Sequence, residues 1–188
     1  MNTTQASRSA HQPRPIKDGF EVLDHCHRET LHALDTLSAL VSHLETQGTD
    51  DAARAMAAQV VKHFSTIARQ HHEDEERHVF PRVLAGGDAQ VEQTVRRLQQ
   101  DHCWLEEDWM ELSAHLEALA AGHSWWDLAF LRDGAQIFIA LAIDHITLEE
   151  ACIYPEARAR LQGAERREMG REMAARRRAQ RAARKADV

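Results

Sequence analysis

The chain has 188 residues, a formal net charge of −7 at pH 7, 43% hydrophobic residues and 28% charged residues. A chain of this length can bury the core of one domain. The acidic balance argues against nucleic-acid binding by the domain as a whole. No apolar run approaches the roughly 20 residues that a membrane span requires, so no membrane segment is predicted.

The N-terminal residues 1–17 are polar and lack the apolar stretch of a secretion signal. We therefore expect a flexible N-terminal arm and a cytoplasmic protein. The cysteines are odd in number and lack the spacing of a metal knuckle or a disulfide framework. Reduced thiols that pack as small buried apolar groups are therefore expected at Cys26, Cys103 and Cys152.

From Asp18 onward, apolar residues recur at the three- and four-residue spacing of amphipathic helices. Short segments that contain Gly and Asp separate these stretches. Helices are predicted over about 18–46, 51–80, 89–121 and 127–154. Because short connections place consecutive helices antiparallel, the expected fold is all-α, an up-down-up-down four-helix bundle over residues 18–158.

The C-terminal residues 159–188 are rich in arginine and alanine. This composition predicts a basic tail that is helical or disordered. Such a charge run is most simply a solvated extension, although a partner protein could bind it.

A segment of the second predicted helix returns 74 residues later in the fourth. His71 precedes Glu75 by four residues, and His145 precedes Glu149 by four. In both copies a second Glu follows directly, and an aromatic residue and a helix-ending proline follow at the same distance. Residues four apart share one helix face. Each copy can therefore direct an imidazole and a carboxylate toward the same point.

An alternative frame pairs His72 with Glu76 at the same four-residue spacing. The matching positions of the other copy are Ile146 and Glu150, so the repeat favours the first frame. His72, Glu76 and Glu150 are then expected to be solvated or to hydrogen-bond to a ligand from outside the site.

Histidines also interrupt the apolar stripes of the first and third predicted helices. These are His27, which lies on its stripe where His25 does not, and His102, which Glu106 follows four residues later. Imidazoles and carboxylates on core faces are costly to bury unless they are paired or bind a metal. Mixed imidazole and carboxylate ligation suits iron, manganese or zinc. The candidate metal ligands are His27, His71, Glu75, His102, Glu106, His145 and Glu149.

These motifs together resemble the hemerythrin-like family, the HHE cation-binding domain, over about residues 20–158. The resemblance rests on Cys26-His27-Arg28, His71-His72 with Glu75-Glu76 and Phe80-Pro81, Asp101-His102, and His145 with Glu149-Glu150 and Tyr154-Pro155. It implies a non-heme di-iron centre, oxo- or hydroxo-bridged, that binds O₂, NO or peroxide. It also implies Glu75 and Glu149 as bridging carboxylates, with His27, His71, His102 and His145 as terminal ligands.

The third helix departs from the pattern of invertebrate hemerythrins, which have a second His where this chain has Glu106. With Glu106 as a ligand, the protein groups and one bridging oxygen leave one open position on two octahedral metals. The resemblance therefore predicts binding of O₂ or a related small molecule for sensing, storage or delivery. The alternatives are a di-iron redox enzyme handling peroxide or NO, an iron-donating repair protein, and a structural or interaction bundle without a di-iron centre.

Overall fold

The computed structural model describes residues 18–186, so the expected N-terminal arm lies outside the described residues. Between residues 18 and 186 all regular structure is helical and no strand is present, which confirms the all-α prediction. No helix in this range combines the length and apolar character that a membrane span requires. The elements are α1 (Gly19–Thr46), α2 (Asp51–His63), the π-helical turn η1 (Phe64–Ala68), α3 (Arg69–His78), α4 (Phe80–Leu84), α5 (Ala89–Ala120), α6 (Leu128–Leu148), the π-helical turn η2 (Glu149–Ile153), α7 (Tyr154–Arg160) and α8 (Gly163–Ala186).

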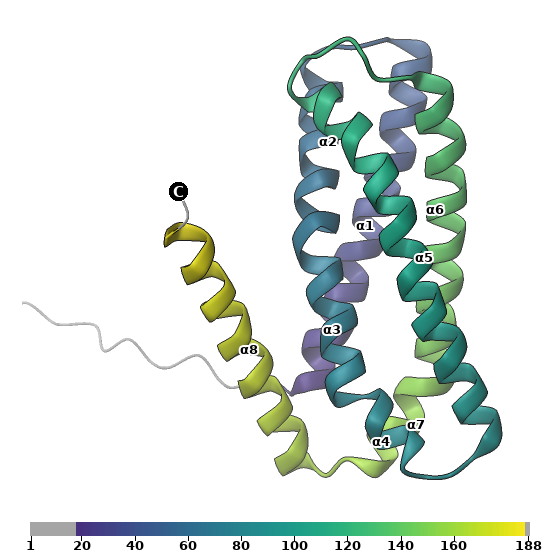
Figure 1. Cartoon of the computed structure of the whole chain (residues 1–188), viewed down its shortest axis with the longest axis vertical. Helices are drawn as coiled ribbons and strands as arrows, with labels where there is room; N and C mark the ends of the chain where they lie inside the picture. Colours follow the sequence, from purple (N-terminus) through teal and green to yellow (C-terminus); the bar gives the residue numbers. More distant parts are fainter. Residues whose placement is uncertain (1–17, 187–188) are drawn as a thin grey trace, which may run out of the picture.

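Long helical segments lie side by side along the vertical axis of Figure 1. The second segment is α2 continued by η1 and α3, and the fourth is α6 continued by η2 and α7. Helix α1 packs against α2 and α6, and α5 packs against the same two helices. The loops that join consecutive segments lie at alternate ends of the molecule (Figure 1). The four segments therefore surround a common interior.

Each long segment begins at an aspartate whose carboxylate accepts a hydrogen bond from a backbone N–H of the first turn. The O···N distances are 2.7–2.9 Å. Aspartate is a preferred N-cap because it satisfies one of the N–H groups that have no partner within the helix. Gly48 and Gly122, with φ of 76° and 78°, follow α1 and α5 and adopt the left-handed conformation that lets the chain turn. The capping residues are Asp18, Asp50, Asp88 and Asp127.

The prolines of the repeat do not end helical structure, contrary to the expectation from sequence. Pro81 lies in the first turn of α4, and Pro155 lies in the first turn of α7. A proline is tolerated at the start of a helix because its missing N–H would have no intrahelical partner there. Each proline therefore begins a short helix that extends the preceding segment.

The interior consists of two apolar clusters with a polar layer between them. Along α1, Leu23 belongs to one cluster, Leu34 belongs to the other, and the buried His27 lies between them. The first cluster includes Leu34, Leu37, Leu40, Phe64, Leu105, Leu112 and Phe138. The second includes Phe20, Leu23, Val79, Phe80, Leu98, Ile153 and Tyr154. The polar layer is therefore shielded from water at both ends.

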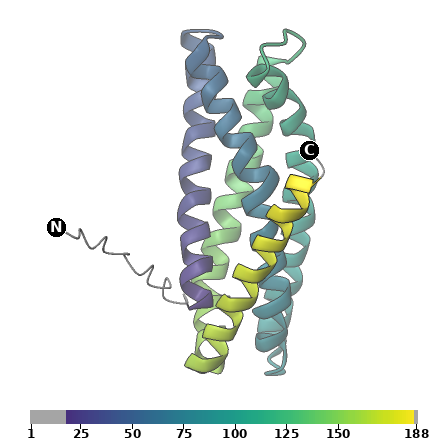
Figure 2. The same cartoon turned by 90° about the vertical axis from the view of Figure 1, so that its left-hand side faces the viewer.

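The C-terminal helix α8 packs on the bundle and is not the solvated extension that its composition suggests. It contacts α1 and α3, and it crosses the face of the bundle in Figure 2. Met169 and Met173, one helical turn apart, are 4% and 0% exposed and join the second apolar cluster. Because the segment is mostly basic, its sequence did not indicate this short apolar stripe.

Two arginines of α8 hold a carboxylate that has no access to solvent. Asp74 is 0% exposed, and Arg177 donates a hydrogen bond of 2.6 Å to its Oδ2. Arg176 donates to Oδ1 of the same carboxylate and lies 3.1 Å from a carboxylate oxygen of Glu73. Asp74 immediately precedes Glu75, so α8 braces the turn of α3 that carries one of the candidate ligands.

All three cysteines are free. Cys26 is buried as expected, whereas Cys103 and Cys152 are exposed, which corrects the expectation for these two. Each exposed cysteine adjoins a buried residue, His102 or Ile153, and consecutive residues on a helix are turned by about 100° about its axis, which places the cysteine at the surface.

Replacing both Arg176 and Arg177 with alanine should lower the free energy of unfolding by about 3–5 kcal/mol, because Asp74 would remain as a buried charge without a partner. Chemical denaturation of the metal-free protein measures the change. The matched control is the double replacement of Arg178 and Arg181, which are exposed on the same helix. Equal stability of the two double variants would contradict the bracing role of α8.

Candidate metal centre

Six of the seven candidate ligands predicted from sequence meet in the polar layer. His27, His71, His102 and His145 are 1–4% exposed, and Glu75 and Glu149 are 0% exposed. One group that could hold a metal ion is His27, His71, Glu75 and Glu149, and a second is Glu75, His102, His145 and Glu149. Within each group the candidate ligand atoms lie within 4.8 Å of one another. Both carboxylates belong to both groups.

Each carboxylate lies between imidazoles from different helices. Nε2 of His27 is 3.2 Å from Oε2 of Glu149, and Nε2 of His145 is 3.1 Å from its Oε1. Nε2 of His71 is 3.3 Å from Oε1 of Glu75, and Nε2 of His102 is 3.5 Å from its Oε2. Neighbouring ligands on one metal ion, each about 2.1 Å from it, are separated by about 3 Å. The spacing therefore suits two ions that share both carboxylates.

The glutamates that follow the buried pair hold the imidazoles from outside. Nδ1 of His102 donates to Glu76 at 2.9 Å, and Nδ1 of His27 donates to Glu150 at 2.9 Å. Both glutamate side chains are about half exposed, at 47% and 52%. A carboxylate on the outer nitrogen orients the ring and keeps the other nitrogen available for a metal. This role matches one of the two expectations for Glu76 and Glu150.

Tyr154 is part of the site, although sequence reasoning did not select it. Its hydroxyl donates a 2.5 Å hydrogen bond to Oε1 of Glu75 and lies 3.1 Å from Nε2 of His27. The phenol ring stacks on the His27 ring with centroids 5.1 Å apart. The only sequence signal was its place in the repeat, where the other copy has Phe80. The hydroxyl makes the two halves of the site chemically different.

Glu106 does not join the cluster. Its side chain is 52% exposed and lies 3.4 Å from the Arg69 guanidinium. Leu105, which is 6% exposed, takes the inward position on this turn of α5. Glu106 therefore lies on the flank of the helix, at the edge of the cavity described below, and whether it binds a metal stays a prediction.

His72 lies closer to the cluster than its assignment from sequence indicated. It forms a third possible metal-binding group with His102 and His145. Its ring stacks on the His102 ring at a centroid distance of 4.0 Å, and its Nδ1 is buried without a hydrogen-bond partner. The available signal was its repeat partner Ile146, because an apolar residue at the matching position indicates an inward-facing place.

Most of the buried side-chain atoms without a hydrogen-bond partner in the described residues belong to this layer. Both ring nitrogens of His71 and of His145, and both carboxylate oxygens of Glu149, have none. Nε2 of His102 and Oε2 of Glu75 are also without a partner. Buried polar groups in folded proteins are almost always satisfied. Metal ions would supply the missing interactions, so the donor set fits a metal-binding site.

In the metal-free protein, two imidazoles of the layer carry protons in the region where metal ions could bind. Burial lowers the pKa of His102, but the nearby carboxylates of Glu149, Glu75 and Glu76 outweigh it and raise the pKa to about 11. Burial also lowers the pKa of His145, but the charge of Glu149 outweighs it and raises the pKa to about 9. Both imidazoles are therefore charged at neutral pH and offset the buried carboxylates.

The remaining groups respond differently to burial. Burial lowers the pKa of His71 and of His72 well below the usual value, so both rings are neutral at pH 7. Burial together with the charge of Glu149 raises the pKa of Glu75 to about 7. Burial raises the pKa of Glu149, but the charge of His145 and the nearby imidazoles of His102 and His27 outweigh it, so the pKa is lowered and the carboxylate is ionised. Neutral imidazoles can bind a metal without losing a proton.

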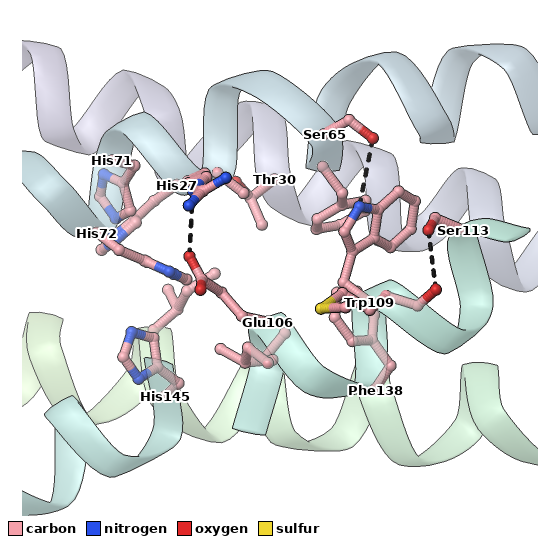
Figure 3. Close-up of a pocket in the computed structure, with 17 residues that line it drawn as sticks. His27, Thr30, Ser65, His71, His72, Glu106, Trp109, Ser113, Phe138 and His145 are labelled. Carbon is pink, nitrogen blue, oxygen red and sulfur yellow. Dashed lines mark hydrogen bonds and ion pairs between the residues drawn. The ribbon is translucent and has the colours of Figure 1, made fainter. Parts of the chain in front are cut away.

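A cavity of about 320 Å³ adjoins the cluster. His71, His72 and His145 lie at one end of it, and Trp109 and Phe138 lie at the other (Figure 3). The pair of Arg69 and Glu106 lines it as well. A small molecule in this cavity would therefore contact the candidate metal ligands directly.

Metal binding should weaken as the pH falls, because a metal ion must displace the protons held by His102 and His145. Their pKa values of about 11 and about 9 lie above neutrality, so both protons are present in the metal-free protein at pH 7. Each displaced proton changes the apparent affinity about tenfold per pH unit. Competition with a chelator of known pH dependence, together with proton release in weak buffer, measures the effect. An affinity independent of pH between about pH 6 and pH 8 would contradict this assignment of protons.

Comparison with known proteins agrees with this geometry. The family model "Hemerythrin HHE cation binding domain" matches residues 18–157, which include every member of the cluster. An uncharacterized protein of Haemophilus influenzae is 31% identical over 158 residues, covering 84% of this chain and 89% of that protein. The match over most of the chain, together with the buried His and Glu cluster, shows that this protein belongs to the hemerythrin HHE cation-binding family.

Proposed function

We propose that this protein is a non-heme di-iron protein that binds O₂ or a related small molecule for sensing, storage or delivery. The observation that carries the proposal is the pair of overlapping ligand groups that share Glu75 and Glu149. Two carboxylates common to two sets of imidazoles are suited to bridging a pair of ions. We further propose that the helices enclosing them form an antiparallel up-down-up-down four-helix bundle, a scaffold that builds metal sites from inward-facing residues.

In the proposed ligand set, His27 and His71 hold one ion, and His102 and His145 hold the other. His72 is the fifth terminal imidazole, in the place that sequence reasoning assigned to Glu106. The support is its buried and unpartnered Nδ1 in a group with His102 and His145. Imidazole and carboxylate donors suit iron, with manganese or zinc as alternatives. Two bound iron ions would supply redox-active metal with an open coordination position beside the cavity.

The free thiols are compatible with a reducing compartment. Disulfides are rare in the cytosol, where thiols remain reduced, and Cys26, Cys103 and Cys152 are all free. We therefore propose a cytoplasmic setting for the protein.

Metal analysis of protein purified from iron-supplemented cells tests the proposal. We expect two irons per chain and near-ultraviolet charge-transfer bands, and titrations with O₂, NO and peroxide should then shift the bands. Replacing Glu75, Glu149 or His72 with alanine should lower the metal content, with the larger loss and several kcal/mol of stability for the two glutamates. Glu106→Ala is the matched control and should retain both ions. Full metal content in the Glu75 and Glu149 variants, or one zinc without such bands in the parent protein, would refute the di-iron centre.

The second candidate function is a di-iron redox enzyme that consumes peroxide or NO. The observation that favours it is the Tyr154 hydroxyl, a buried proton donor 2.5 Å from Glu75. Reduction of peroxide to water requires electrons, which an external reductant would supply, and protons at the reacting oxygens; a positioned acid accelerates the proton transfer.

Steady-state peroxide consumption by the iron-loaded protein, with ascorbate as the external electron donor, distinguishes an enzyme from a binding protein. If the protein is an enzyme, Tyr154→Phe should keep its metal content and lose at least about tenfold in turnover. Absence of turnover in the parent protein would leave the binding role, and unchanged turnover in the variant would exclude Tyr154 as the donor.

A further inference from the structure

The cavity beside the buried His and Glu cluster is much larger than a diatomic gas requires. Its volume is about 320 Å³, whereas a molecule the size of water occupies about 30 Å³ in the liquid. A buried apolar cavity of about 150 Å³ is sufficient to bind benzene. Sites for small organic molecules begin at about 300 Å³. The dimensions therefore suit a ligand the size of a substituted ring.

One end of the cavity is formed by three aromatic rings. The ring centroids of Phe64 and Phe138 are 4.9 Å apart with the planes nearly perpendicular, and Trp109 lies 5.1 Å from Phe64. The indole N–H of Trp109 donates to Oγ of Ser65 at 3.3 Å, which leaves an apolar face toward the cavity. Edge-to-face and offset contacts are the favoured arrangements between aromatic rings. This end therefore suits a planar ring.

The opposite end is polar but holds no charged side chain that lacks a partner. His71 and His145 are 3% and 2% exposed, line the cavity, and have ring nitrogens without a hydrogen-bond partner. The charged residues that line the cavity have partners: Arg69 pairs with Glu106, and Nε2 of His145 lies 3.1 Å from a carboxylate oxygen of Glu149. The side chains of Arg69 and Glu106 are 78% and 52% exposed, so they lie at the rim. An ionic ligand would find no unpaired counter-charge, whereas a single neutral polar group could hydrogen-bond to a ring nitrogen of His71.

The local backbone helps to create this space. The π-helical turn η1 (Phe64–Ala68) interrupts the segment that continues into the candidate ligands, and Phe64, Ser65 and Ala68 all line the cavity. Insertion of a π turn into a helix frequently accompanies a functional site. The π turn that lines the cavity therefore belongs to the same helical segment as His71 and His72.

We propose that the cavity binds a small neutral aromatic molecule with one polar group, of the phenol class. Its ring lies among Phe64, Trp109 and Phe138, and its hydroxyl faces the histidines. Binding of the ring does not require metal. The position of the hydroxyl next to a metal centre rests on the proposed function.

Calorimetric titration with phenol tests the proposal on both metal-free and metal-loaded protein. We expect one phenol per chain with a dissociation constant in the micromolar to low millimolar range in both forms. Benzoate, which has the same ring but a negative charge, should bind at least about tenfold more weakly. In the metal-loaded protein, phenol should also shift the charge-transfer bands.

Filling the cavity provides the matched comparison. Ala142→Phe places a ring in the cavity and should weaken phenol binding at least about tenfold. Ala140→Phe makes the same change on the exposed side of the same helix and should leave binding unchanged. If Ala142→Phe fails to fold, a fluorescence measurement replaces it. Trp104, Trp125 and Trp126 are changed to phenylalanine, and 4-bromophenol should then quench the fluorescence of the remaining Trp109.

Different results would overturn the proposal in different ways. If phenol binds neither form, the cavity serves small gases alone. Binding only to the metal-loaded form would mean that the metal, and not the aromatic end, holds the ligand. Benzoate binding as tightly as phenol would exclude a neutral ligand. If the metal-free protein binds phenol but the protein purified from iron-supplemented cells does not hold two irons per chain, the cavity site is supported and the di-iron function fails. The two proposals can therefore be separated.

Discussion

The burial of two carboxylates in one layer is the constraint on which the rest of this structure depends. Glu75 and Glu149 have no access to solvent, and imidazoles from more than one helix lie beside each of them. An isolated buried carboxylate costs several kcal/mol or more. In the metal-free protein, protonated histidines offset part of that cost, as the raised pKa values of His102 and His145 indicate. Metal ions would offset it more completely, because they also satisfy the nitrogen and oxygen atoms that now lack partners.

The surroundings of the layer follow from this constraint. Apolar clusters at both ends exclude water, and the glutamates after the buried pair orient His27 and His102 from the surface. Helix α8 adds a further support, since its arginines neutralise Asp74 next to Glu75. On one side of the layer, the cavity leaves room for a small molecule. A polar layer that is shielded at both ends and adjoins a cavity is suited to the proposed binding of a small molecule at a metal.

Glu106 lies farther from the cluster, and His72 lies closer to it, than the sequence indicated. Both differences have the same physical origin. Helical periodicity locates an inward face only to within about one residue, because an apolar stripe is wider than a single line of side chains. On α5 the neighbouring Leu105 occupies the inward place, so Glu106 turns toward Arg69 at the surface. On α3 the face is wide enough to include His72 as well as His71. The internal repeat favoured Glu75 over Glu76, whereas Glu106 lies outside the repeated segments and Ile146 was only an indirect sign that His72 faces inward.

The sequence alone was sufficient for the all-α class, the helix boundaries near the aspartate caps, and the four histidines and two glutamates that meet inside. These depend on local periodicity, capping and an internal repeat, which are properties of neighbouring residues. Tertiary structure decided what depends on contacts between distant segments. It brought Tyr154 against Glu75 across 79 positions and Arg177 against Asp74 across 103. It also packed a basic tail on the bundle and opened a cavity, because the geometry between helices is not encoded in the period of any one of them.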